Sequence, residues 1–344
     1  MPSPRDAGLS IFVIGILLAL SLRFDIGALA LIAFFVAGVD LRFESIGSGF
    51  SDVGVVVRAG VDLAVSGGNP YGVGYAVSSP PGAPFAYGPL ALLWYLAVAE
   101  PWVMELVVSI VILVLLTLRG GPMGLAIYAT MPILAGLASD GSNDTSAGLL
   151  LLVGLVVMER MPRGGAFLLG LAIAFKPYVL AWVPPLFMWA GAGALVAALF
   201  GAAIFWLPAF IMWGPGAILR SFQLAESVHG SPYYSLAVVL QRFFGPVSAD
   251  LMGIFRLLAG GLTTIAVLPF VRSHAGVVVG GTLIYLATLF SGYWSTFAYF
   301  AAIAPVLAWY LDDWLGPEGV RVRWRVLEGS IAEIDKSWPR VARA

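Results

Sequence analysis

Long apolar runs recur along this chain and constrain its fold more than any other feature. A helix needs about 20 apolar residues to cross a hydrocarbon core about 30 Å thick. Runs near that length occupy residues 8–22, 25–39, 101–118, 122–138, 145–158, 164–190, 191–212, 250–271, 275–290 and 294–311. A shorter run, 86–100, contains Pro89, and Lys176-Pro177 interrupts 164–190. The pattern predicts an all-α integral membrane protein, a polytopic bundle of about 10–12 transmembrane helices.

Composition supports a membrane protein and excludes several other classes. Of 344 residues, 60% are hydrophobic and only 11% are charged, and the mean hydropathy is +0.95. Ordinary soluble domains are about 45–50% apolar and about 25% charged. The net charge of −1 provides no basic surface, so we expect no nucleic-acid partner. The absence of Cys and the presence of only two His make a metal site built from those residues improbable.

Basic residues in short connections indicate which face of the membrane each loop occupies, because such connections stay cytoplasmic. The basic clusters are Arg119, Arg160 with Arg163, Arg272, and the tail 321–343. Placing all of them inside brings residues 139–145, Lys176, the loop 213–249 and residues 291–294 to the outer face. We therefore expect residues 1–312 to form the membrane domain, with a short cytoplasmic tail at 313–344. The sidedness of the N-terminus stays open.

The segment 40–89 is predicted to be a long first outer loop. Residues 52–66 place apolar and polar side chains on opposite sides of a helix, which is typical of an interfacial helix. Gly67-Gly68-Asn69-Pro70 ends that helix. Four prolines between 78 and 89 stiffen the remainder and place Tyr87 directly before the next helix. The loop is either a rigid cap or part of a binding site.

The motifs of this loop resemble those of a known enzyme family. In order, they are S-D-V-x(4)-R-A-G, G-G-N-P-Y and P-x-A-Y-G-P-L-A-L-L. They resemble the first outer loop of polyprenol-phosphate-mannose-dependent mannosyltransferases of the C-type (GT-C) membrane glycosyltransferase superfamily, above all the branch that elongates phosphatidylinositol mannosides. Asp52 matches the family's acidic position and Tyr71 belongs to the glycine-rich break. Gly88 stands where a first proline is common in the family.

Two weaker likenesses lie further along the chain. Residues 171–178 (LAIAFKPY) are similar to the Lys-containing helix end of the family, and residues 139–144 (SDGSND) are similar to a polar turn in related mannosyltransferases. The resemblance covers mainly residues 45–185. It implies a cell-envelope glycosyltransferase that moves a hexose, first of all mannose, from a polyprenyl-phosphate sugar to a lipid or glycan acceptor. The active site would lie on the extracytoplasmic face of the cell membrane.

Transfer of a sugar from a lipid phosphate needs a base for the acceptor hydroxyl and a group that stabilises the departing phosphate. The resemblance and its position at a helix start make Asp52 the expected base, with Asp40 and Glu44 as competitors. For the phosphate, Lys176 is the strongest physical signal, since it is one of only two Lys and lies within an apolar run. The structural alternative is snorkelling to the interface, or an ion pair with Asp140 or Asp144.

Further polar and aromatic side chains in the same loops are expected to contact the donor phosphate or the substrates. They are Tyr71, Tyr87, Asn143, Asp144, Arg220, His229 and Tyr233. His229 alternatively is simply an exposed loop residue. No cofactor is expected, and a divalent metal is possible but not favoured, since the outer loop has no D-x-D pattern.

A polytopic transporter or flippase for a lipid or a polyprenyl phosphate is the alternative function. Such a protein would also bury a Lys among many membrane helices. It would, however, show related halves with paired broken helices, and polar residues near the midplane of the bilayer. An enzyme would collect its polar residues on one face, and the charge pattern favours that arrangement.

Overall fold

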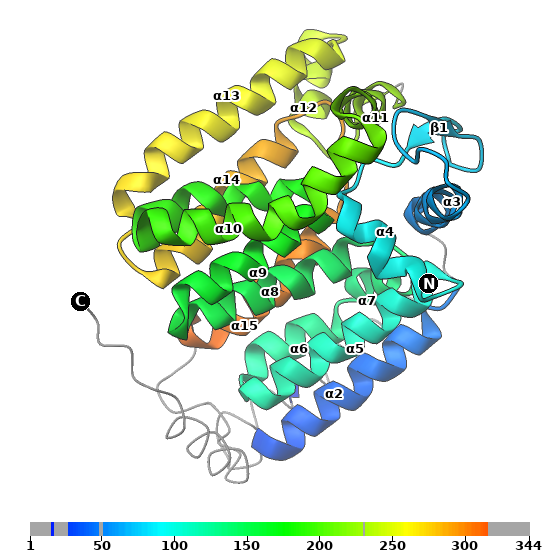
Figure 1. Ribbon diagram of the computed structural model, residues 1–344. Coiled ribbons are helices and arrows are strands. Elements are labelled where there is room, and N and C mark those ends of the chain that lie inside the picture. Colours follow the sequence, from blue (N-terminus) through cyan, green and yellow to red (C-terminus); the bar gives the residue numbers. More distant parts are fainter. Residues whose placement is uncertain (1–14, 17–26, 48–50, 230, 316–344) are drawn as a thin grey trace. The chain divides into compact units, whose positions relative to one another are not determined.

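The computed structural model of the chain describes residues 15–16, 27–47, 51–229 and 231–315 (Figure 1). Most of the predicted run 8–22 and almost all of the predicted tail 313–344 lie outside the described residues. The helices are α2 (Gly27–Glu44), α3 (Val53–Val65), α4 (Pro89–Leu96), α5 (Pro101–Arg119), α6 (Pro122–Thr130), α7 (Pro132–Ser139), α8 (Asp144–Arg160), α9 (Pro162–Phe175), α10 (Val183–Trp213), α11 (Pro215–Ser227), α12 (Leu236–Phe244), α13 (Ala249–Val267), α14 (His274–Phe290) and α15 (Tyr299–Leu315), with the 3-10 helices η1 (Pro177–Trp182) and η2 (Leu268–Phe270).

Helices dominate the described residues, and the prediction of an all-α protein is confirmed at that level. The strands within these residues form one short antiparallel ribbon in the first loop, β1 (Gly74–Tyr75) with β2 (Ala83–Pro84). Tyr75 pairs with Ala83, and the backbone N–H of Gly82 donates to the carbonyl of Tyr75 (2.9 Å). The ribbon therefore closes the proline-rich stretch into a compact loop.

Fewer helices than expected are long and apolar enough to cross a membrane. Within the described residues these are Pro101–Arg119, Pro177–Trp213 and Ala249–Phe270, and a fourth span results if Pro122–Thr130 and Pro132–Ser139, bent by 59°, count as one. The prediction of about 10–12 full spans is thus not met in this part of the chain. The physical reason is that proline divides apolar runs into shorter helices, as Pro177 does after α9 and Pro132 does after α6.

The chain forms two compact units. The first comprises residues 1–44, 110–135 and 307–344, and the second comprises residues 45–109 and 136–306. In the first unit α2 packs on α6, where a Cβ on Gly38 would lie 2.8 Å from the Cβ of Ala129. The buried guanidinium of Arg42 donates to the carbonyls of Tyr128 and Ala129 (both 3.2 Å). These carbonyls lie in the last turn of α6, so Arg42 caps that helix.

In the second unit the chain reverses direction twice between α9 and the end of α10. Gly193 lies against Arg163, and Gly170 lies against Ala198, so α9 and the later part of α10 run parallel. Residues 177–190 return between them, and Gly191, with a φ of 73°, breaks the helix before the chain turns again. The chain thus turns at the Lys176-Pro177 break that interrupts the predicted run 164–190.

The remaining long helices of the second unit alternate around this core. Gly281 lies against Trp182, and the His274 ring contacts Trp189 (centroids 5.6 Å apart), so α14 runs antiparallel to residues 177–190. Gly260 of α13 lies against Thr288 near the end of α14, and Val267 lies against Gly280. Lys176 contacts Asp144, and Tyr178 contacts Tyr299, so the connections before α8, after α9 and before α15 meet at one end of this unit.

Candidate functional site

A buried ion pair lies at that end of the second unit. The Nζ of Lys176 is 2.7 Å from Oδ1 of Asp144, and the two side chains are 5% and 3% exposed. Lys176 is an extended residue between α9 and η1, because Pro177 cannot continue the helix. Asp144 is the first residue of α8. Two helix breaks therefore bring the charges together, and the sequence alternative of an ion pair with Asp144 is what the structure contains.

Tyrosine side chains surround the pair. The hydroxyl of Tyr178 donates to Oδ1 of Asp144 (2.6 Å), and Nζ of Lys176 lies 5.2 Å from the Tyr178 ring centroid and 5.3 Å from that of Tyr87. Tyr178 in turn contacts the rings of Tyr285 (5.1 Å) and Tyr299 (6.0 Å). An ammonium group has three N–H donors, and Asp144 accepts one of them. The others are suited to an anionic ligand.

Tyr87 lies within electrostatic range of two carboxylates. Burial raises the pKa of the Tyr87 hydroxyl well above its usual value, and the negative charges of Asp144 and Asp52 raise it further. The hydroxyl is therefore a neutral hydrogen-bond donor at physiological pH. The Tyr87 hydroxyl thus interacts electrostatically with the carboxylate of the buried ion pair and with the carboxylate at the start of α3.

Asp52 occupies the position before the first turn of α3, as the sequence predicts. Its Oδ2 accepts a hydrogen bond from the backbone N–H of Ser79 (2.7 Å), the one hydrogen bond of this carboxylate within the described residues. The Oγ of Ser51 caps the helix instead, accepting from the N–H of Val53 (3.1 Å). The partly exposed carboxylate thus keeps Oδ1 available for chemistry. Asp62, ten residues along, is exposed and pairs with Arg58 (2.8 Å).

The competing carboxylates Asp40 and Glu44 are exposed residues of α2 in the first unit. Neither takes part in the contacts around Lys176 described above. Within the second unit, Asp52 and Asp144 both lie at a helix start and both act electrostatically on Tyr87, but Asp144 is already engaged in the ion pair with Lys176. The described residues contain no group of three or more His, Cys, Asp or Glu side chains placed to hold a metal ion.

His229 and Tyr233 belong to an aromatic cluster beside Trp294. The His229 and Trp294 rings are parallel within 3° with centroids 3.9 Å apart, and Tyr233 lies 6.3 Å from Trp294. Burial lowers the pKa of His229, and the negative charge of Asp52 opposes this shift. The imidazole is therefore neutral near pH 7, and it lies within electrostatic range of Asp52.

The remaining predicted binding residues differ in their surroundings. Asn143 is fully buried, and neither its Oδ1 nor its Nδ2 has a hydrogen-bond partner among the described residues. Tyr71 is 1% exposed and donates its hydroxyl to the carbonyl of Tyr87 (3.1 Å), so it supports the loop. Arg220 is exposed on α11, and none of the contacts above includes it. The predicted substrate contacts of these three residues stay predictions.

The sequence reasoning missed Glu105, a fully buried carboxylate of α5. It accepts hydrogen bonds from the Tyr95 hydroxyl, from Oγ of Ser146 and from the N–H of Ser146 (2.9 Å). That N–H lies in the first turn of α8, so Glu105 caps this helix from a neighbouring one. The available signal was a lone carboxylate inside an apolar run, the rule that singled out Lys176.

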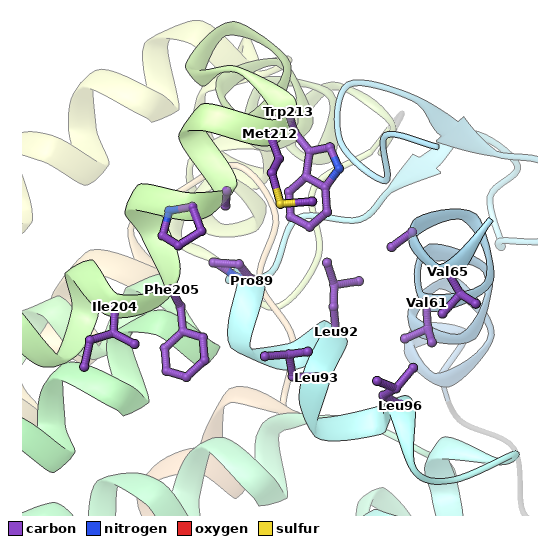
Figure 2. A pocket seen from close by; sticks show the side chains of 13 residues that line it. Val61, Val65, Pro89, Leu92, Leu93, Leu96, Ile204, Phe205, Met212 and Trp213 are labelled. Atoms are coloured by element: carbon purple, nitrogen blue, oxygen red, sulfur yellow. The ribbon is translucent and has the colours of Figure 1, made fainter. Parts of the chain in front are cut away.

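An apolar groove of about 380 Å³ lies between α3, α4 and the later part of α10 (Figure 2). Val61 and Val65 line it from α3, Leu92 and Leu96 from α4, and Trp213 from the end of α10. Pro89 lies at the groove two residues after Tyr87, and Trp213 contacts the Tyr71 ring (5.5 Å). The groove therefore adjoins the loop that carries Tyr87.

No protein-family model, curated protein or solved structure matches the chain. The resemblance to polyprenol-phosphate-mannose-dependent mannosyltransferases therefore rests on the sequence motifs alone. The geometry of the second unit has to carry the functional argument independently of any relative.

Proposed function

We propose that this protein is a membrane glycosyltransferase that transfers a hexose from a polyprenyl-phosphate sugar to a lipid or glycan acceptor. Mannose is the hexose we expect. One observation carries the proposal: the buried Lys176–Asp144 pair, Tyr87 and the Asp52 carboxylate gather at one end of the second unit, beside an apolar groove. Transfer from this donor requires a cation that binds the phosphate, a carboxylate that accepts the hydroxyl proton, and an apolar groove for the polyprenyl chain.

The donor fits this arrangement in two parts. Its polyprenyl chain would occupy the groove between α3, α4 and α10, whose lining is apolar. Its phosphate would lie near Lys176, whose ammonium retains donors beyond the one accepted by Asp144. Tyr87 stands between the two parts, since its ring faces Lys176 and the groove starts at Pro89.

The transfer would proceed by one displacement. The acceptor hydroxyl oxygen attacks the anomeric carbon from the face opposite the phosphate, and the new C–O bond forms as the C–O bond to phosphate breaks. The hydroxyl proton passes to the Asp52 carboxylate, and the polyprenyl phosphate leaves with the bonding electron pair. Lys176 stabilises the growing charge on the phosphate. The anomeric configuration is inverted, and this scheme involves no resident cofactor.

A transporter or flippase is the second candidate, and the placement of the polar residues favours the enzyme. Asp52, Tyr87, Asp144 and Lys176 all stand at ends or breaks of helices. A transporter would gather them near the bilayer midplane, whereas the basic connections place them at one face of the membrane. The proposal also includes an extracytoplasmic site in the cell membrane, based on the basic connections. It further includes membrane crossings by shorter apolar helices such as α9 and α14.

The test is a transfer assay with purified full-length protein in lipid nanodiscs. A panel of radiolabelled polyprenyl-phosphate sugars is incubated with membrane-lipid and glycan acceptors. The proposal predicts that label from one donor moves to an acceptor with inverted anomeric configuration. If no sugar moves from any donor while fluorescent polyprenyl phosphate equilibrates across proteoliposomes containing the protein, the transporter is correct and the enzyme is not.

A further inference from the structure

Two loops of the second unit are joined at the end that carries the candidate site. The N–H of Ser295 donates to the carbonyl of Tyr233 (2.9 Å), and Oγ of Ser235 donates to the carbonyl of Tyr293 (2.7 Å). Arg256 of α13 also donates to the carbonyl of Trp294 (3.3 Å). Loops far apart in the sequence are thereby fixed as one surface.

Aromatic rings form this surface, and we refer to His229, Tyr233, Tyr234 and Trp294 as the aromatic ledge. His229 stacks in parallel on Trp294, and Tyr233 lies nearly parallel to Trp294 (22°). Tyr233 and Tyr234 are 46% and 55% exposed. Tyr234 has a φ of +39°, a conformation that costs energy in a bulky residue and that persists only where its surroundings hold it.

The ledge adjoins the loop that binds Asp52. Ser79 of that loop donates to the Asp52 carboxylate (2.7 Å), and a Cβ on Gly82 would lie 3.9 Å from a methyl carbon of Val228. Val228 directly precedes His229. The negative charge of Asp52 also acts on the His229 imidazole, which places the candidate base and the ledge in one neighbourhood.

The chemistry of the ledge selects a sugar ring over other ligands. Aromatic faces carry partial negative charge, and the C–H bonds on one face of a pyranose carry the opposite polarity, so the two surfaces attract. A sugar also needs hydroxyl partners, and the buried Oγ of Ser295 has no hydrogen-bond partner within the described residues. The neutral His229 offers a further hydrogen-bonding group without charge.

We propose that the aromatic ledge binds a pyranose ring of the acceptor and presents one of its hydroxyls to Asp52. The acceptor is then a glycan or glycolipid with a terminal sugar. This inference rests on the proposed glycosyltransferase function and adds the class of acceptor to it.

The experiment compares acceptors and ledge variants in the same nanodiscs. The acceptors are an α-linked dimannoside, a serine-containing peptide, and water, which reports hydrolysis of the donor. The variants are Trp294→Leu and Tyr233→Ala, with Trp294→Phe as the conservative replacement. Trp189→Leu is the matched control, because it removes the other His–Trp contact of this unit, Trp189 with His274.

Loss of one stacking ring should raise the KM for dimannoside about tenfold. Donor hydrolysis, measured in the same variants, separates a loss of acceptor binding from a loss of the donor site, and Trp294→Phe should restore most of the affinity for dimannoside. Trp189→Leu should behave as wild type. An unchanged KM in both Trp294→Leu and Tyr233→Ala would overturn the ledge as a subsite, and transfer to the peptide in preference to dimannoside would overturn the acceptor class.

Failure of the proposed function gives a different result. In that case wild-type protein consumes no donor with any acceptor or with water. The ledge is then tested by saturation-transfer NMR, which detects dimannoside binding directly. Saturation transfer to dimannoside that disappears in Trp294→Leu supports a sugar-binding ledge, whereas no transfer to wild-type protein overturns it.

Discussion

At the residue scale, the Lys176–Asp144 pair is the feature that most needs a functional explanation. Burying two charges costs several kcal/mol per ion, and mutual attraction offsets this only with good geometry and additional hydrogen bonds. The pair has those hydrogen bonds through Tyr178 and Ser142. A well-packed apolar pair of similar volume would stabilise the protein equally well. The proposed role in holding phosphate would give the pair a function beyond stability.

Separating charge from stability requires changing both partners. Lys176→Met alone leaves Asp144 buried without its cation, which should cost about 3–5 kcal/mol. The double variant Lys176→Met with Asp144→Asn removes that penalty, so we expect it to melt near wild type in a thermal unfolding assay. It should nevertheless lose sugar transfer. Wild-type transfer rates in the folded double variant would make the pair purely structural.

Glu105 gives a second prediction at this scale. Glu105→Ala leaves the Tyr95 hydroxyl and the Ser146 N–H buried without their acceptor, and each such loss costs about 1–3 kcal/mol. Calorimetry should therefore show a clearly lower melting temperature for Glu105→Ala. Glu105→Gln should lower the melting temperature by a smaller amount. Glu100→Ala, an exposed carboxylate nearby, is the control and should change stability by less than about 0.5 kcal/mol. Equal melting of both Ala variants would remove Glu105 as a cap.

At the element scale, the apolar runs located most helices but only some of their breaks. The predicted helix 52–66 corresponds to α3 at Val53–Val65, because its pattern and its glycine-rich end are both local signals. The prediction of a membrane helix over 294–311 is wrong at its start, because residues 291–298 form a loop and α15 starts at Tyr299. Judged by composition alone, aromatic residues such as Trp294 are compatible with a membrane helix. Trp294 instead pairs with Tyr233 of a distant loop, and this long-range contact keeps Trp294 outside a helix.

The site was predictable only where a residue contrasted with its surroundings. Lys176 contrasted in this way, because it is a cation within an apolar run. The prediction of Asp52 as the base depended on the resemblance to the family motif. The groove could not be predicted, because its three walls come from residues 61–65, 89–96 and 204–213, which nothing local connects. Long-range packing determined that part of the structure.

The groove yields the prediction at this scale. Leu93→Trp inserts a large ring from the groove wall, so it should raise the KM for a donor with a long polyprenyl chain severalfold. A donor with a two-isoprene chain should be unaffected, because it does not extend along the wall. Leu199→Trp, on an exposed face of α10 outside the groove, is the matched control. An equal loss with both donors would show a general disturbance of the fold.

At the scale of the whole molecule, the account requires that the site end of the second unit faces outward. Single cysteines at Ala76 and Ser231, both exposed near the site, should react with an impermeant maleimide on intact cells. Cysteines at Met161 and Arg272, exposed at the opposite connections, should react only after permeabilisation. The chain has no native Cys, so the background is clean. The reverse pattern would place the site in the cytoplasm.

The central claim, that Asp52 takes the proton from the acceptor hydroxyl, is tested most directly by the turnover of Asp52→Asn. The amide keeps the size of the side chain and can still accept from Ser79, but it cannot take a proton. Turnover should fall by about 10²–10⁴-fold, while the affinity for the polyprenyl-phosphate sugar stays within a few-fold. Asp62→Asn, on the exposed side of the same helix, should keep wild-type turnover. Wild-type turnover in Asp52→Asn, or equal losses in both variants, would contradict the account.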